Sequence, residues 1–202
     1  MSLCMECMQE KGGEQVCPHC GYDPAAEPVN AAYLSPGTVL QERYILGRVL
    51  GQGGFGITYM GCDQVLSTRV AVKEYYPGDI AQRTPGAATV QPYTQTGEDY
   101  ERGKSRFLDE ARTLAKFADF PGIVSIKDCF EAEGTAYMVM QFLEGVDLKE
   151  YLQRKGGTVE PQEAVAILTP VMDALREIHK TGIIHRDISP DNIFVTTEGQ
   201  IK

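Results

Sequence analysis

The glycine-rich stretch "GQGGFG", residues 51–56, is the feature that most constrains the fold of this chain. It lies between two strand-like runs, "YILGRVL" and "ITYMGCD". A dinucleotide-binding loop with the same Gly-x-Gly-x-x-Gly spacing must open a helix, whereas here a strand follows. The stretch therefore predicts a β-hairpin whose backbone amides can approach phosphate groups, because glycine has no side chain to block them. Taken alone, the spacing is also compatible with a glycine-rich hairpin that has no ligand.

The remainder of residues 42–202 is predicted to contain further strands and then helices. After the hairpin come a strand, "TRVAVKEYY", a polar stretch, an amphipathic helix, "RFLDEARTLAKF", and two strands, "GIVSIKDCF" and "TAYMVMQFL". Two helices follow. The first, "DLKEYLQRKGG", has Asp147 as N-cap and Gly156 as stop, and the second begins at Pro161 with a kink expected at Pro170. This order predicts an α+β fold with a small β-rich lobe and a helical lobe.

Four of the six cysteines lie in the first 20 residues, as "CMEC" and "CPHC" with nine residues between them. Two cysteines three positions apart can turn both thiolates towards one ion, and two such pairs complete the tetrahedral set that suits zinc. We therefore predict a zinc ribbon of the rubredoxin-like kind over residues 1–24, with a structural metal and with His19 pointing to solvent. Unpaired surface cysteines and a redox pair are the alternatives. The predicted zinc ligands are Cys4, Cys7, Cys17 and Cys20.

Residues 25–41 are predicted to be a linker, because Pro28 and Pro36 stand among small residues. The second domain then spans residues 42–202.

The charge balance argues against nucleic acid as a partner. Nineteen basic and 28 acidic residues give a formal net charge of −9, which repels phosphate backbones and acidic membrane surfaces. The ribbon segment 1–24 offers only Lys11 as a cation and Tyr22 as an aromatic residue. No run approaches the roughly 20 apolar residues of a membrane span, and no signal peptide is present, so we expect a cytoplasmic protein without a membrane segment.

The motif "VAVK" supplies a candidate phosphate-binding cation. The two-residue period of a strand places Ala71 and Lys73 on one face, where a small alanine leaves room for a planar base beside the lysine. A candidate partner for Lys73 is Glu110, which borders the apolar stripe of the helix "RFLDEARTLAKF". Further on, "YMVMQFLEG" is typical of a hinge after a strand, with Met140 at the back of the pocket.

The stretch "HRDISPDNIFV" follows a long helix and precedes a strand, and it puts Asp187 and Asn192 five residues apart on one loop. An aspartate in this position can accept a hydroxyl proton, and an amide oxygen can ligate magnesium. His185 and Arg186 are expected to hold the loop together.

Taken in order, these motifs resemble the eukaryotic-like protein kinases of bacteria over residues 42–202. The resemblance implies an ATP-dependent kinase that transfers the γ-phosphate to serine and threonine hydroxyls of proteins. It implies that Lys73 pairs with Glu110 and holds the α- and β-phosphates, that Asp187 is the catalytic base, that Asn192 ligates Mg²⁺ and that Phe194 lies under the adenine. The residues expected to contact the nucleotide are Leu50, Gly51, Gly53, Gly54, Gly56, Thr58, Ala71, Lys73, Met140, Asn192 and Phe194.

The chain departs from this family in several places. Thr58 replaces the usual valine, 36 residues separate Lys73 from Glu110, and Ser189 stands where a lysine is usual. The chain ends at Lys202, before an Asp-Phe-Gly motif, so we expect a truncated kinase that is inactive alone.

Two other functions remain open from the sequence. One is a nucleotide-binding pseudokinase or scaffold that regulates a partner. The other makes the zinc ribbon a docking module for a protein.

Overall fold

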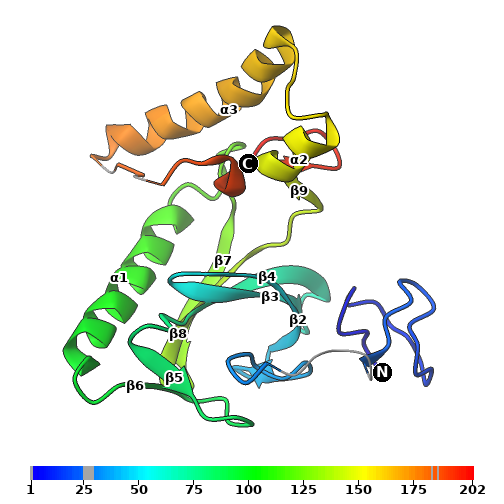
Figure 1. Cartoon of the computed structure of the whole chain (residues 1–202), viewed down its shortest axis with the longest axis vertical. Coiled ribbons are helices and arrows are strands. Elements are labelled where there is room, and N and C mark those ends of the chain that lie inside the picture. Colours follow the sequence, from blue (N-terminus) through cyan, green and yellow to red (C-terminus); the bar gives the residue numbers. More distant parts are fainter. Residues whose placement is uncertain (1, 25–29, 183, 186) are drawn as a thin grey trace. The chain divides into compact units, whose positions relative to one another are not determined.

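The computed structural model describes residues 2–24, 30–182, 184–185 and 187–202. These residues form two compact units. The first comprises Met1–Lys116 and Ile126–Phe142, and the second comprises Phe117–Ser125 and Leu143–Lys202. Figure 1 shows the strands concentrated in the first unit and the helices α2 and α3 in the second. The expected α+β class is confirmed. Within the described residues, none of the helices is long and apolar enough to cross a lipid bilayer.

A six-stranded antiparallel sheet forms the centre of the first unit, in the order β1-β2-β3-β4-β8-β7. Its strands alternate inward and outward side chains, as expected for runs rich in β-branched and aromatic residues. Their bounds are Val39–Leu40, Tyr44–Gly53, Gly56–Asp63, Thr68–Tyr75, Ile126–Ala132 and Thr135–Gln141 for β1, β2, β3, β4, β7 and β8. The core on this sheet is rich in tyrosine, including Tyr44, Tyr59 and Tyr137, each at most 1% exposed.

Part of the predicted linker belongs to this core. Residues 25–29 lie outside the described part of the chain, but Leu34 and Leu40 are 4% and 3% exposed and pack with the sheet residues. Strand β1 pairs with β2 through Leu40 and Tyr44. Residues 30–41 are therefore attached to the sheet rather than separate from it.

The polar stretch after β4 forms a two-stranded sheet of β5 (Ala81–Arg83) and β6 (Val90–Pro92), which the sequence does not predict. Helix α1 follows at Gly97–Ala115, so it begins well before the predicted start at Arg106. It packs against β7 and β8 and buries Tyr100, Phe107, Leu108 and Ala111.

The described part of the second unit contains helices α2 and α3 and a small antiparallel sheet. Helix α2 (Leu148–Arg154) is capped as expected, because the backbone N–H of Glu150 donates to the Asp147 carboxylate at 2.7 Å. Helix α3 (Pro161–Lys180) has Pro161 in its first turn and Pro170 in its interior. Strands β9 (Gly145–Asp147) and β10 (Phe194–Thr196) pair and place the 3₁₀ turn Pro190–Asn192 beside α2.

Candidate functional site

The glycine-rich stretch is the predicted hairpin, closed by the pairing of Gly53 with Gly56. At Gly51, Gly53 and Gly54, no atom of the described residues, apart from each glycine's own chain neighbours, lies within 4 Å of the position that a Cβ atom would take, so their backbone faces an open region. Gly56 is different, because a Cβ there would lie 2.2 Å from the carbonyl oxygen of Glu74. The first three glycines thus leave the hairpin accessible to a ligand, and the last lets β3 approach β4.

The strand register places four predicted nucleotide-contacting residues on one face of the sheet. Thr58 lies directly opposite Lys73, and Ala71 lies directly opposite Met140. Residues opposite each other in antiparallel strands point to the same side, and so do residues two apart in one strand. This face, defined by Thr58, Ala71, Lys73 and Met140, is called the nucleotide face below. Leu50 is half-buried in β2, immediately before the hairpin glycines.

Glu110 does not meet Lys73 in this structure. Glu110 is exposed on α1, whose buried face is formed by Phe107, Leu108 and Ala111, and within the described residues no ion pair joins it to Lys73. The apolar stripe therefore locates the helix on the sheet but does not turn Glu110 towards the lysine. The pairing stays a prediction for a different position of α1.

The structure does bring Asp187 and Asn192 together. The Nδ2 group of Asn192 donates to the Asp187 carboxylate at 3.0 Å and to the Asp187 backbone carbonyl at 3.1 Å. Among the described residues no hydrogen bond reaches Oδ1 of Asn192, so this amide oxygen is available for a cation. Phe194 is half-buried in β10, opposite Asp147. His185 is exposed, and Arg186 lies outside the described residues.

The loop that carries this pair is attached to α2. Lys149 Nζ lies 2.8 Å from Asp191 Oδ1, and this ion pair lowers the pKa of Asp191 through its hydrogen bond. The 3₁₀ turn is closed by the backbone N–H of Asn192, which donates to the carbonyl of Ser189. These contacts hold Asn192 at the end of a short, ordered turn.

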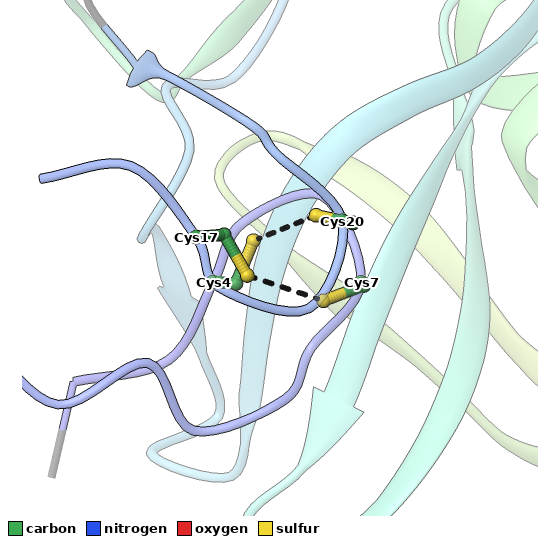
Figure 2. A group of neighbouring side chains, drawn as sticks. All are labelled: Cys4, Cys7, Cys17 and Cys20. Atoms are coloured by element: carbon green, nitrogen blue, oxygen red, sulfur yellow. Dashed lines mark hydrogen bonds between the residues drawn. The ribbon is translucent and has the colours of Figure 1, made fainter. Parts of the chain in front are cut away.

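The four N-terminal cysteines converge on one point (Figure 2). The Cys4 and Cys20 sulfurs are 3.6 Å apart, the Cys7 and Cys17 sulfurs are 3.8 Å apart, and all four lie within 4.8 Å of one another. A tetrahedral zinc ion with Zn–S bonds of about 2.3 Å requires sulfurs about 3.8 Å apart, whereas a disulfide would require about 2 Å. The four thiols are free, and their spacing fits a zinc ion.

The thiols also influence one another electrostatically. Burial opposes ionisation of Cys17, but the backbone N–H groups of His19 and Cys20 and the neighbouring thiols lower its pKa to about 6. Burial and the neighbouring thiols raise the pKa of Cys20 to about 12. Simultaneous ionisation of all four thiols would therefore require a cation among the sulfurs. His19 is exposed as expected, and its Nε2 lies 3.0 Å from the Glu10 carbonyl rather than among the sulfurs.

Contacts between the first cysteine turn, residues 4–8, and the sheet were not predicted. Met8 is 6% exposed and clusters with Met60 and Cys62 of β3. The sequence signal is slight: "CMEC" is followed by methionine, whereas "CPHC" is followed by glycine.

A family model described as "Protein kinase domain" matches residues 44–202. The serine/threonine-protein kinase PrkC of Bacillus subtilis is 34% identical over 166 residues, which cover 82% of this chain and 22% of PrkC. The probable serine/threonine-protein kinase PknB of Lactococcus lactis is 30% identical, with 82% of this chain and 23% of PknB covered. The chain thus spans about a fifth of the length of these curated relatives.

Solved structures also match most of this chain. A structure described as "PpkA-294 apo form" superposes with a TM-score of 0.77 and 32% identity, covering 84% of this chain and 60% of the other. The Mycobacterium tuberculosis PknI kinase domain, as the C20A mutant, superposes with a TM-score of 0.64 and 25% identity, covering 84% and 60%.

Proposed function

Because this chain belongs to the protein kinase domain family, we propose that it forms the nucleotide-binding part of an ATP-dependent kinase that phosphorylates serine and threonine residues of proteins. The observation that carries the proposal is the hydrogen bond between Asn192 and Asp187, because it orients a carboxylate and leaves an amide oxygen free on the same loop. The relatives named above, whose printed names are those of serine/threonine-protein kinases, support the choice of hydroxyl substrate.

In this proposal the nucleotide face binds ATP. The open glycines Gly51, Gly53 and Gly54 would donate backbone hydrogen bonds to phosphate oxygens, and Lys73 would neutralise the α- and β-phosphates. Ala71 and Met140, opposite each other on β4 and β8, would contact the adenine. Thr58 would flank the same ring, and Phe194 would contribute from β10.

The loop residues would carry out the chemistry. Asp187 would accept the proton of the substrate hydroxyl as its oxygen forms a bond to the γ-phosphorus and the bond from that phosphorus to the β–γ bridging oxygen breaks, with ADP leaving. Asn192 would offer Oδ1 to Mg²⁺, which neutralises phosphate charge when bound. Glu110 would pair with Lys73 once α1 brings the two together.

The experiment has two stages. First, ATP binding to the purified chain is measured by isothermal titration calorimetry; we expect binding that Lys73→Ala weakens. Second, phosphate transfer to serine, threonine and tyrosine peptides is measured with the complete gene product, where Asp187→Asn should abolish it. No ATP binding would refute the proposal. Binding without transfer in the complete gene product would indicate the pseudokinase alternative instead.

We further propose that Cys4, Cys7, Cys17 and Cys20 hold a structural zinc ion, and that residues 1–24 form a ribbon. The sulfur separations support this, because they match the spacing of four thiolates around one zinc ion. Cobalt substitution tests it, because tetrahedral cobalt–thiolate sites absorb strongly in the visible range and Cys17→Ser should change that spectrum. We also propose a cytoplasmic location, which the free cysteines support, because disulfides are rare in that compartment. A protein partner for the ribbon stays a proposal.

A further inference from the structure

The two cysteine turns have the same backbone geometry but different residues at their last position. The N–H of Met8 donates to the Cys4 carbonyl at 2.9 Å, and the N–H of Gly21 donates to the Cys17 carbonyl at 2.9 Å. Both residues have positive φ, 57° for Met8 and 76° for Gly21. Glycine adopts this conformation freely, whereas methionine is strained in it. The strain at Met8 must be offset by contacts of its side chain.

Those contacts lie on the nucleotide face. Met8 is buried against Met60 and Cys62, and Leu50 and Phe142 pack against this cluster. Met60 lies directly opposite Ala71 and two residues after Thr58, so it extends the nucleotide face along β3. The cluster therefore joins the first cysteine turn to residues on two sides of the proposed adenine site: Leu50 before the hairpin glycines, and Phe142 in the hinge segment.

The backbone of the first cysteine turn also contacts β2. The N–H of Arg48 donates to the Met5 carbonyl at 2.8 Å. A Cβ atom on Gly47 would lie 2.1 Å from that carbonyl oxygen and 2.3 Å from Met8 Cε, so only glycine permits the approach. The Glu6 carboxylate adds an ion pair, with Oε1 2.8 Å from Arg48 Nε, although the Nε–H is not aligned with it for a hydrogen bond.

From these contacts we propose that the first cysteine turn, residues 4–8, is an outer wall of the nucleotide site, in which Met8 positions Leu50 and Phe142 against the adenine. The turn is held by Cys4 and Cys7, so a metal bound by the cysteines maintains this wall and favours adenosine binding. By linkage, a nucleotide bound there favours the metal-loaded ribbon. The inference rests on the proposed nucleotide function and adds a residue from outside the kinase domain to it.

The test separates an adenine-side role from a general loss of structure. Dissociation constants of adenosine and of inorganic tripolyphosphate are measured for the zinc-loaded wild type, Met8→Gly, Met8→Leu and Val16→Ala. Met8→Gly removes the side chain and relieves the backbone strain, Met8→Leu restores an apolar side chain, and Val16, 46% exposed in the same ribbon, provides the matched control. We expect Met8→Gly to weaken adenosine binding about five- to tenfold with little change for tripolyphosphate. Met8→Leu should recover most of the loss and Val16→Ala should have no effect.

Removal of the metal provides a second, independent test of the proposal. A chelator should weaken adenosine binding to the wild type by a similar factor but have little further effect on Met8→Gly, because both changes act through the same contact. Additive effects of the chelator and the substitution would overturn the proposed route from metal to nucleotide.

Docking of the turn is followed separately through Cys62, which is 8% exposed beneath Met8. Alkylation of Cys62, located by peptide mass spectrometry, should accelerate in Met8→Gly and after chelation. If wild-type protein binds no adenosine, the proposed nucleotide function fails. If it binds and Met8→Gly binds equally, or loses adenosine and tripolyphosphate affinity alike, only the role given to Met8 is overturned.

Discussion

Single residues in this structure hold turns by accepting several hydrogen bonds at once, and Asp63 is the clearest case. Its carboxylate accepts from Arg43 Nη2 at 2.7 Å and from Arg43 Nε at 3.1 Å, and it also accepts from the backbone N–H groups of Val65 and Leu66 at 3.0 and 3.1 Å. The side chain is 4% exposed. Hydrogen bonds from Arg43, followed by those from the turn, lower the pKa of Asp63.

This arrangement predicts a pH-dependent contribution to stability. Because the folded pKa lies below the unfolded value of about 4, the contribution is present above about pH 4 and is lost as the pH falls through the folded pKa. We expect Asp63→Asn to reduce the free energy of unfolding by about 1–2 kcal/mol at pH 7 and by less below pH 4. Urea unfolding at pH 7, 5 and 3 measures this. A difference that stays constant over that range would contradict the assignment.

The same residue scale shows where sequence patterns predict side-chain positions and where they do not. Strand periodicity places Ala71 and Lys73 on one face, and the register confirms it, because pleating fixes the direction of each side chain. A helix has no comparable constraint at the edge of its stripe, so Glu110 is exposed although its spacing suits a position facing Lys73. The partner of Asn192 was not predicted either, because hydrogen bonds within a loop depend on its local turns.

At the scale of elements, a buried ion pair helps to attach the polar stretch after β4 to the main sheet, together with the core residues Ala81 and Val90. Arg83 of β5 contacts the Glu74 carboxylate of β4, with side chains 1% and 0% exposed, and it also donates to the carbonyls of Ala32 and Ala88. The hydroxyls of Tyr59 and Tyr137 donate to the same carboxylate at 3.0 and 2.8 Å. Arg83 and Glu74 therefore connect three parts of this unit: the stretch after β4, the segment before β1 that contains Ala32, and the main sheet.

Removing one partner of this ion pair should reduce the free energy of unfolding more than replacing both partners. Arg83→Met leaves a buried carboxylate without its cation, and we expect a loss of about 3–5 kcal/mol in the free energy of unfolding. Adding Glu74→Gln removes the charge while keeping acceptors for the two tyrosines, and it should restore at least half of that loss. Urea unfolding of the wild type, both single variants and the double variant gives the coupling. A double variant no more stable than Arg83→Met would contradict this account.

Secondary-structure elements were missed where a strand is too short to show a hydrophobic period in the sequence. Strands β5 and β6 have three residues each, less than two full alternations, and each buries one apolar residue, Ala81 or Val90, beside the ion pair of Arg83. Helix α1 was predicted too short because its first two turns, "GEDYERG", bury Tyr100 but otherwise carry mainly charges. Strands β2, β3 and β4 were predicted because each has eight or more residues, with apolar, β-branched and aromatic side chains bounded by turn residues.

At the scale of the whole molecule, the charge balance argues against nucleic acid as a partner. The formal net charge of −9 opposes binding to polyanions, and the ribbon has Lys11 as its only lysine or arginine. We expect no binding of labelled duplex DNA or single-stranded RNA by fluorescence anisotropy at 50 mM salt, where electrostatic binding is strongest. Binding that falls steeply between 50 and 200 mM salt would contradict this expectation and would favour an adaptor role for the ribbon.

The division into two units makes a prediction about unfolding. The segment with the four cysteines belongs to the unit that contains the six-stranded sheet, where residues 4–8 contact Gly47, Arg48 and Met60. A metal that binds the folded ribbon stabilises that unit by mass action, and the benefit disappears when a chelator removes it. We expect chelation to lower the melting temperature of this unit by about 5–10 °C and to leave the other unit unchanged. Cys17→Ser, which removes a ligand from the second cysteine turn, should have the same effect without chelator.

Hydrogen exchange during thermal ramps assigns the loss of protection to β2 and β3 or to α2 and α3. Equal loss of protection in both units would show that they unfold as one, and no loss in either would show that the ribbon does not contribute to the stability of the sheet.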